Sequence, residues 1–186
     1  MNQGVHYVDM LQWIMGGVAS VQAQIRTVAH ERIEVEDVAN ALLTFRNGAV
    51  GVLQASTTAY PGLAERIEVH GLYGTAILEG DVLKLWKVDP AGSQLGKYGD
   101  GVNKQPTPKT PLLGEKSESQ GGGSSDPTAI WGEQHRLQIE DFVHAIVDDR
   151  KPEVSGEDAI EPLKVILAIY ESARKGGQLV EIAPAN

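Results

Sequence analysis

The chain has 186 residues, with 16 lysine and arginine residues against 25 aspartate and glutamate residues and a formal net charge of -9. This acidic excess argues against a nucleic-acid partner, because binding phosphates requires clustered Lys and Arg. The absence of cysteine excludes disulfides, thiolate metal sites and a cysteine nucleophile. No run of about 18 apolar residues suggests a membrane span, and the N-terminus does not have the pattern of a signal peptide. The predicted location is cytoplasmic.

Residues 5–15 are predicted to form a helix. Four side chains recur at i, i+3, i+4 and i+7 on one face: His6, Asp9, Met10 and Trp13. Gly16-Gly17 follows directly, which is typical of a left-handed C-cap.

From Val18 to Val88 the sequence period changes to two, which predicts strands. The predicted strands are Val18–Val28, Val38–Arg46, Ala49–Thr58, Arg66–His70, Thr75–Leu78 and Val82–Val88. Asn47-Gly48 predicts a type I′ hairpin turn, in which both central residues take positive φ. No helical pattern intervenes, so neighbouring strands are expected to be antiparallel.

Residues 89–131 differ from the rest of the chain in composition. This stretch of 43 residues contains eight Gly, five Pro and five Ser. A connection of this length is unusual inside a compact domain. It is interpreted as a solvated surface insertion, with a lid or an oligomer arm as the alternative.

Two amphipathic helices and a short strand complete the predicted elements. The helix over 133–149 has an apolar stripe made of Ile139, Phe142, Val143, Ile146 and Val147. The helix over 156–175 is expected to bury Leu163, Ile166, Leu167, Tyr170 and Ala173. Ser155 and Asp158 predict a capping box, and Pro162 predicts a kink or a restart. Gln178–Ile182 is the last predicted strand.

The element order predicts an α+β fold in one domain over residues 1–186. It consists of a mostly antiparallel open β-sheet with helices packed on one face. Both faces of the predicted strands carry apolar side chains, with Ala39, Ala41, Leu43 and Phe45 on one side and Leu42 on the other. Because a one-sided sheet should alternate more cleanly, the second face is expected to serve oligomerisation, at least as a dimer.

His6 is the one histidine in an informative position, at the start of a helix with Asn2 one turn away. Histidine can exchange protons near neutral pH, whereas Asn can only orient a carbonyl or hydroxyl group. His6 with Asp9 provides too few ligands for a metal, so no metal site is predicted. The sequence has no Gly-x-Ser-x-Gly elbow and no Gly-x-Gly-x-x-Gly turn between a strand and a helix, so no cofactor site is predicted in this chain.

Several segments, in order, resemble the second domain of the Gfo/Idh/MocA oxidoreductases, which are NAD(P)-dependent sugar and polyol dehydrogenases. These segments are Asn2–Trp13, Phe45–Ala49, Tyr60–Gly62, Arg66–Gly71, His135–Ile146 and Ala168–Ala173. Each motif is weak alone, but the ordered set is fairly specific and covers nearly the whole chain outside 89–131.

The resemblance implies a role for particular residues. His6 matches the family's catalytic histidine, which exchanges a proton with the substrate hydroxyl, and Asn2 stands where many members have Asp. Tyr60 could reach the substrate, although packing at a sheet edge explains it equally well. Intact members also have an N-terminal Rossmann domain and a Glu-Lys-Pro motif. Neither occurs here, so the chain is expected to be a C-terminal fragment that is inactive alone.

Two functions follow as hypotheses. The first is the substrate-binding and oligomerisation half of an enzyme that transfers hydride between NAD or NADP and a sugar or polyol. The alternative is a standalone binding or scaffold module without catalysis. Neither hypothesis involves a nucleic acid or a membrane.

Overall fold

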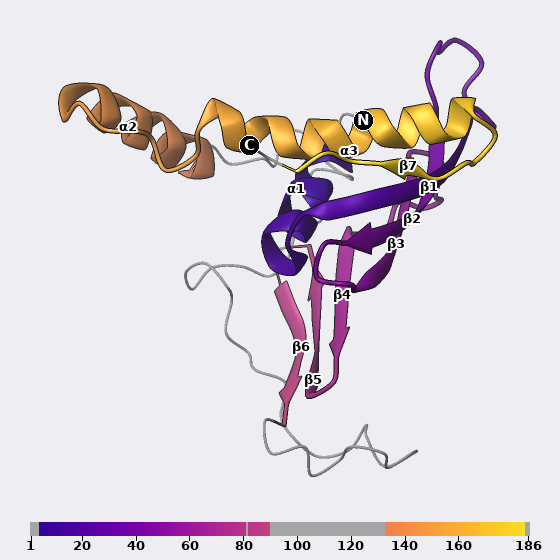
Figure 1. Ribbon diagram of the computed structural model, residues 1–186, viewed down its shortest axis with the longest axis horizontal. Helices are drawn as coiled ribbons and strands as arrows, with labels where there is room; N and C mark the ends of the chain where they lie inside the picture. Colours follow the sequence, from indigo (N-terminus) through magenta and orange to yellow (C-terminus); the bar gives the residue numbers. More distant parts are fainter. Residues whose placement is uncertain (1–3, 81, 90–132, 185–186) are drawn as a thin grey trace. The chain divides into compact units, whose positions relative to one another are not determined.

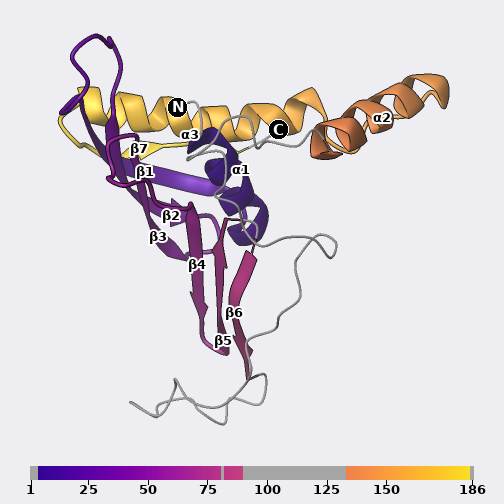
Figure 2. The same cartoon turned by 180° about the vertical axis from the view of Figure 1, so that it is seen from behind.

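The computed structural model describes residues 4–80, 82–89 and 133–184 (Figures 1 and 2). They form two compact units: the first holds the described residues up to Tyr60 and from Glu133 onwards, and the second begins at Pro61. Apart from Asp89, the predicted insertion over 89–131 lies outside the described residues. The single domain over residues 1–186 stays a prediction.

Helix α1 spans Gly4–Met15, as predicted. It ends at Gly16, whose φ of 83° lies in the left-handed region and whose backbone N donates to the Gln12 carbonyl at 2.8 Å. Val8 is 2% exposed in the core, and Leu11 and Met15 pack beside it at helical spacing. This apolar line fixes which side of α1 faces the rest of the first unit.

The first unit contains a four-stranded antiparallel sheet in the order β3-β2-β1-β7. Its strands are β1 (Val18–Arg26), β2 (Val38–Phe45), β3 (Val50–Ser56) and β7 (Val180–Glu181). The second unit contains a separate antiparallel sheet in the order β4-β5-β6. Its strands are β4 (Arg66–Gly71), β5 (Gly74–Glu79) and β6 (Val82–Val88). The predicted α+β class and antiparallel pairing are confirmed, with the strands divided between two sheets.

The β2–β3 hairpin forms, but the prediction of a type I′ turn was wrong. Gly48 has φ 87°, whereas Asn47 does not have positive φ. Gly48 N donates to the Phe45 carbonyl at 2.9 Å, and Phe45 N donates to Ala49 O at 2.8 Å. The loop is therefore one residue longer, with glycine alone in the left-handed position. The Asn47 amide instead donates to the Met15 carbonyl at 2.9 Å and helps to close the end of α1.

Helix α3 spans Gly156–Arg174 and packs on β1, beside β7 (Figures 1 and 2). Its predicted capping box is present: Asp158 N donates to Ser155 Oγ at 3.2 Å, and Ser155 N donates to Asp158 Oδ2 at 2.9 Å. The helix is continuous through the buried Pro162, so a restart there does not occur.

The buried face of α3 differs from the prediction. Ile166 is buried as expected, but Leu163 and Leu167 are 41% and 59% exposed. The other residues that face the core are Val165, Ala168, Ile169 and Ser172. Two of them, Ala168 and Ser172, are small and let the helix approach the sheet closely. The face of α3 that contacts the sheet is thus shifted by about one residue around the helix from the predicted face, which carries the largest side chains.

The two sides of the first sheet are unequally covered. Ala41, Leu43 and Phe45 of β2 are 2–3% exposed and face α1 and α3. On the opposite side, Leu42, Val50 and Val52 are 57%, 78% and 66% exposed. The predicted division of apolar residues between two faces is confirmed, and one of these faces is open to solvent.

Helix α2 spans Glu133–Val147. Its predicted apolar stripe was expected to be covered by the sheet, and this was wrong. The stripe residues are 49–75% exposed: Ile139, Phe142, Val143, Ile146 and Val147. Ala145, at 4% exposed, is the buried side chain of this helix among those described. Within the described ranges, no helix is both long and apolar enough to cross a membrane.

Candidate functional site

The first turn of α1 positions His6 at the surface. Val8 anchors the helix in the core, and residues two apart on a helix are separated by about 200° around its axis. His6 therefore lies on the side of α1 away from the core, where its side chain is exposed. An imidazole in this position is accessible for proton exchange with a bound molecule.

The other two predicted site residues are not brought to His6 by any described contact. Asn2 lies outside the described residues. Tyr60 is the last residue of the N-terminal stretch of the first unit. Its side chain is 95% exposed, so it is not packed against the first unit. The role of Asn2 is therefore untested, and Tyr60 does not line the pocket described below.

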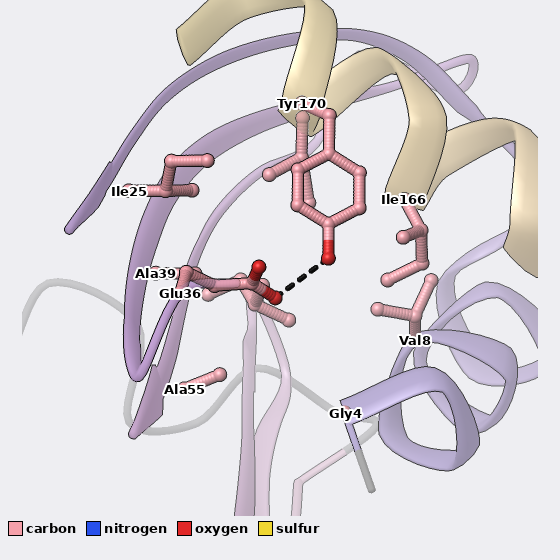
Figure 3. A pocket seen from close by; sticks show the side chains of 10 residues that line it. Gly4, Val8, Ile25, Glu36, Ala39, Ala55, Ile166 and Tyr170 are labelled. Atoms are coloured by element: carbon pink, nitrogen blue, oxygen red, sulfur yellow. Dashed lines mark hydrogen bonds between the residues drawn. The ribbon is translucent and has the colours of Figure 1, made fainter. Parts of the chain in front are cut away.

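A small hollow opens on the covered side of the sheet, beside the start of α1 (Figure 3). Its walls are mainly apolar and come from α1, the sheet and α3, with Gly4, Val8, Ile25, Ala39, Ala55 and Ile166 among them. Gly4 belongs to the same helical turn as His6, but His6 does not line the hollow.

Glu36 and Tyr170 supply the polar groups of this hollow. The Tyr170 hydroxyl donates to Glu36 Oε1 at 2.7 Å, as the dashed line in Figure 3 marks. Burial, with the adjacent Glu36 carboxylate, raises the pKa of Tyr170 to about 12. Burial acts to raise the pKa of Glu36 as well, but hydrogen bonds from Tyr170 and the Glu36 backbone outweigh it and lower that pKa. At neutral pH the pair is a phenol bound to a carboxylate.

Asp37 fixes the connection in which Glu36 lies. Its side chain is buried and accepts hydrogen bonds from the backbone N of Val28, Ala29 and His30 at 2.8, 2.8 and 3.0 Å. The His30 ring lies 3.2 Å away. Burial opposes ionisation, but these donors outweigh it and hold the pKa of Asp37 well below its usual range. Asp37 is therefore a structural carboxylate.

The sequence analysis missed the Glu36–Tyr170 pair. Tyr170 was expected on the buried face of α3, but its partner lies 134 residues earlier in the chain. Two adjacent acidic residues just before a strand, Glu36 and Asp37, were the available signal. Among the described residues, no group of three or more His, Asp or Glu side chains could hold a metal ion.

Comparison with known proteins relates the N-terminal part of this chain to a family model. Residues 1–77 match the family model of the GFO/IDH/MocA C-terminal domain. Over these residues the chain is similar to the GFO/IDH/MocA C-terminal domain. The resemblance inferred from the sequence motifs is thereby confirmed. The chain is also 36% identical over 80 residues to the uncharacterized oxidoreductase YrbE of Bacillus subtilis (strain 168). The matched residues are 41% of this chain and 24% of YrbE.

Solved structures extend the likeness to nearly the whole chain. The WlbA dehydrogenase from Bordetella pertussis, in complex with NADH and UDP-GlcNAcA, matches with a TM-score of 0.71 and 28% identity. This match covers 99% of this chain and 47% of the WlbA chain. Levoglucosan dehydrogenase, in complex with NADH and levoglucosan, matches with a TM-score of 0.68 and 25% identity over 97% of this chain and 49% of that one. The chain thus spans about half the length of these dehydrogenases.

The phenol of Tyr170 gives the hollow a measurable signature. Its folded-state pKa of about 12 lies above the ordinary value of 10, so its contribution to stability is complete below pH 10 and is lost as the pH rises from 10 towards 12. A Tyr170→Phe variant should lose this part of the pH dependence and about 1 kcal/mol of stability at neutral pH.

The measurement is the tyrosinate absorbance of the folded chain during alkaline titration, alongside urea unfolding. Of the five tyrosines, the one that ionises last should disappear in Tyr170→Phe. Tyr60→Phe, which changes a tyrosine that is 95% exposed, is the matched control and should leave the last step in place. A last step that survives in Tyr170→Phe would contradict the assignment.

Proposed function

We propose that this chain provides the substrate-binding and oligomerisation part of an oxidoreductase that acts on a hydroxyl or carbonyl group of a sugar or polyol. His6 is the proton-transfer residue in this proposal. The observation that carries it is the exposed His6 imidazole on a helix anchored by Val8, inside the segment that matches the family model. The structures of WlbA in complex with NADH and UDP-GlcNAcA, and of levoglucosan dehydrogenase in complex with NADH and levoglucosan, support the choice of substrate class.

In this proposal the chemistry of His6 is acid–base catalysis. Its imidazole accepts the proton of the substrate hydroxyl during oxidation and returns it during reduction. Asn2 orients the same hydroxyl without taking a proton, and Tyr60 contributes a hydrogen bond to the substrate. NAD or NADP supplies the hydride acceptor or donor. The sequence has no Gly-x-Gly-x-x-Gly motif between a strand and a helix to hold its pyrophosphate, so the dinucleotide is not assigned to this chain.

The proposal is tested in an intact relative that already binds NADH. Replacing its histidine at the position of His6 by Asn should lower kcat by about 10²–10⁴-fold, the range for a main general acid or base. The affinity for NADH, measured by titration, should stay unchanged and serves as the internal control. An unchanged kcat across the pH range would exclude His6 as the proton-transfer residue.

We also propose that the open face of the first sheet joins two copies of the chain. This face combines the exposed Leu42, Val50 and Val52 with amide side chains from the neighbouring strands, Gln22, Gln24, Asn40 and Gln54. An apolar and amide-rich sheet face suits a two-fold, self-complementary contact better than free solvent. A stable contact of this kind buries about 800 Å² per subunit.

A Val52→Glu variant should weaken this sheet dimer by about tenfold or more, because it places two carboxylates near the two-fold axis in an apolar contact. Sedimentation equilibrium at tens of micromolar protein measures the change. Val35→Glu is the matched control, since Val35 is 60% exposed in the β1–β2 connection and outside the sheet face. A 20.0 kDa monomer for the unmodified chain would refute the proposal.

A further inference from the structure

The turn between β2 and β3 carries an asparagine whose side chain can react with its own backbone. Of the five asparagines in the chain, Asn47 alone precedes a glycine. The backbone nitrogen of the residue after an asparagine can attack the side-chain amide carbon and close a succinimide ring. Glycine hinders this attack least, because it has no Cβ atom and the most backbone freedom. Asn47-Gly48 is therefore the pair in this sequence best suited to the reaction.

The surroundings of this pair leave room for the ring and for water. Asn47 and Gly48 are both exposed. Gly48 has φ 87°, and apart from its chain neighbours no atom lies within 4 Å of the position that a Cβ atom would occupy on it. The space on this side of Gly48 is therefore open. No packed side chain there blocks ring closure or the water that later opens the ring.

Three hydrogen bonds hold the reacting groups while the turn is closed. Gly48 N, the attacking atom, donates to the Phe45 carbonyl at 2.9 Å. Asn47 Oδ1 accepts from Ala49 N at 3.0 Å, and Asn47 Nδ2 donates to the Met15 carbonyl at 2.9 Å. The attack requires a free Gly48 N and a side chain that can rotate towards it, so these bonds must open first. Because each of them favours the closed turn, the folded chain slows the reaction.

We propose that Asn47 is a site of spontaneous deamidation, that opening of the β2–β3 turn controls its rate, and that the product loosens the end of α1. In the first step Gly48 N loses its proton and bonds to Asn47 Cγ, the bond from Cγ to Nδ2 breaks, and the amide nitrogen leaves as ammonia. Water then adds to one of the two ring carbonyls, which gives aspartate or isoaspartate. Water is the co-reactant, and no electrons are exchanged. This inference does not rest on the proposed function.

The product cannot keep the contact with α1. Met15 is the last residue of α1, and the Asn47 amide donates to its carbonyl. A carboxylate has no proton to donate at neutral pH, so this hydrogen bond is lost. The new negative charge also faces the C-terminal end of a helix, where the helix dipole disfavours it. Deamidation thus weakens the last turn of α1, which Gly16 N closes by donating to the Gln12 carbonyl.

Peptide mapping by mass spectrometry tests the reaction and its control by the turn. The unmodified chain is incubated at mildly alkaline pH, folded and in urea, and the conversion of Asn47 to aspartate and isoaspartate is followed. In urea Asn47 should react about tenfold faster or more than in the folded chain, because the hydrogen bonds of the turn are lost. Asn40, which precedes Ala41, is the internal control and should react far more slowly. Equal rates at Asn47 and Asn40 in urea, or equal rates at Asn47 in both conditions, would overturn the proposal.

Amide hydrogen exchange tests the effect on α1. Asn47→Asp reproduces one product and changes an exposed side chain, so the chain should still fold. Amides in the last turn of α1, and that of Gly16, should exchange about fivefold faster or more, while those of α3 stay unchanged. Leu72→Asp is the matched control, because it adds the same charge at a residue that is 68% exposed in a turn of the second unit. Unchanged exchange at the end of α1 in Asn47→Asp, or the same increase in Leu72→Asp, would show that the product does not loosen α1 and would refute this part of the proposal.

Discussion

A single buried hydroxyl group ties together the segments on which the first unit depends. Ser172 is 0% exposed; its Oγ accepts from the backbone N of Ala23 at 2.8 Å and donates to the Gln178 carbonyl at 2.6 Å. It thereby joins α3, β1 and the segment that leads into β7. A buried polar group is tolerated only when its hydrogen bonds are made, and here both are. The small size of Ser172 also lets α3 lie close to β1, which sets the rotation of the whole helix.

The rotation of α3 determines which of its side chains reach the candidate site. It turns Ile166 and Tyr170 towards α1 and the hollow, while Leu163 and Leu167 remain at the surface. Asp37 independently fixes the β1–β2 connection through four hydrogen bonds, so that Glu36 reaches the Tyr170 hydroxyl. The buried Ser172 hydroxyl and the buried Asp37 carboxylate thus hold in place the residues around the first turn of α1.

Local sequence patterns predicted what local physics controls. Helix α1 with its glycine cap, the six strands up to Val88 and the Ser155 capping box follow from periodicity and from capping or turn residues. The errors arose where distant contacts decide. Asn47 avoids positive φ while its side chain binds the Met15 carbonyl. The buried face of α3 follows from the fit of Ala168 and Ser172 against β1, not from side-chain size. The Glu36–Tyr170 pair joins residues 134 positions apart, so the acidic residues before β2 indicated a polar group there but not its partner.

The sheet and α3 support α1, which presents His6 at its surface, and the sheet and α2 each carry exposed apolar side chains. The dehydrogenases that resemble this chain hold NADH and are about twice as long. We propose that these 186 residues carry the substrate and assembly functions and do not themselves bind the dinucleotide.

Isothermal titration of the 186-residue chain with NADH and NADPH tests this claim most directly. The pyrophosphate of a dinucleotide is normally bound by backbone amides at a helix N-terminus that follows a glycine-rich turn, and this sequence has no such turn. We predict no saturable heat of binding at concentrations up to the millimolar range. Saturable binding of either dinucleotide at micromolar concentration would contradict it.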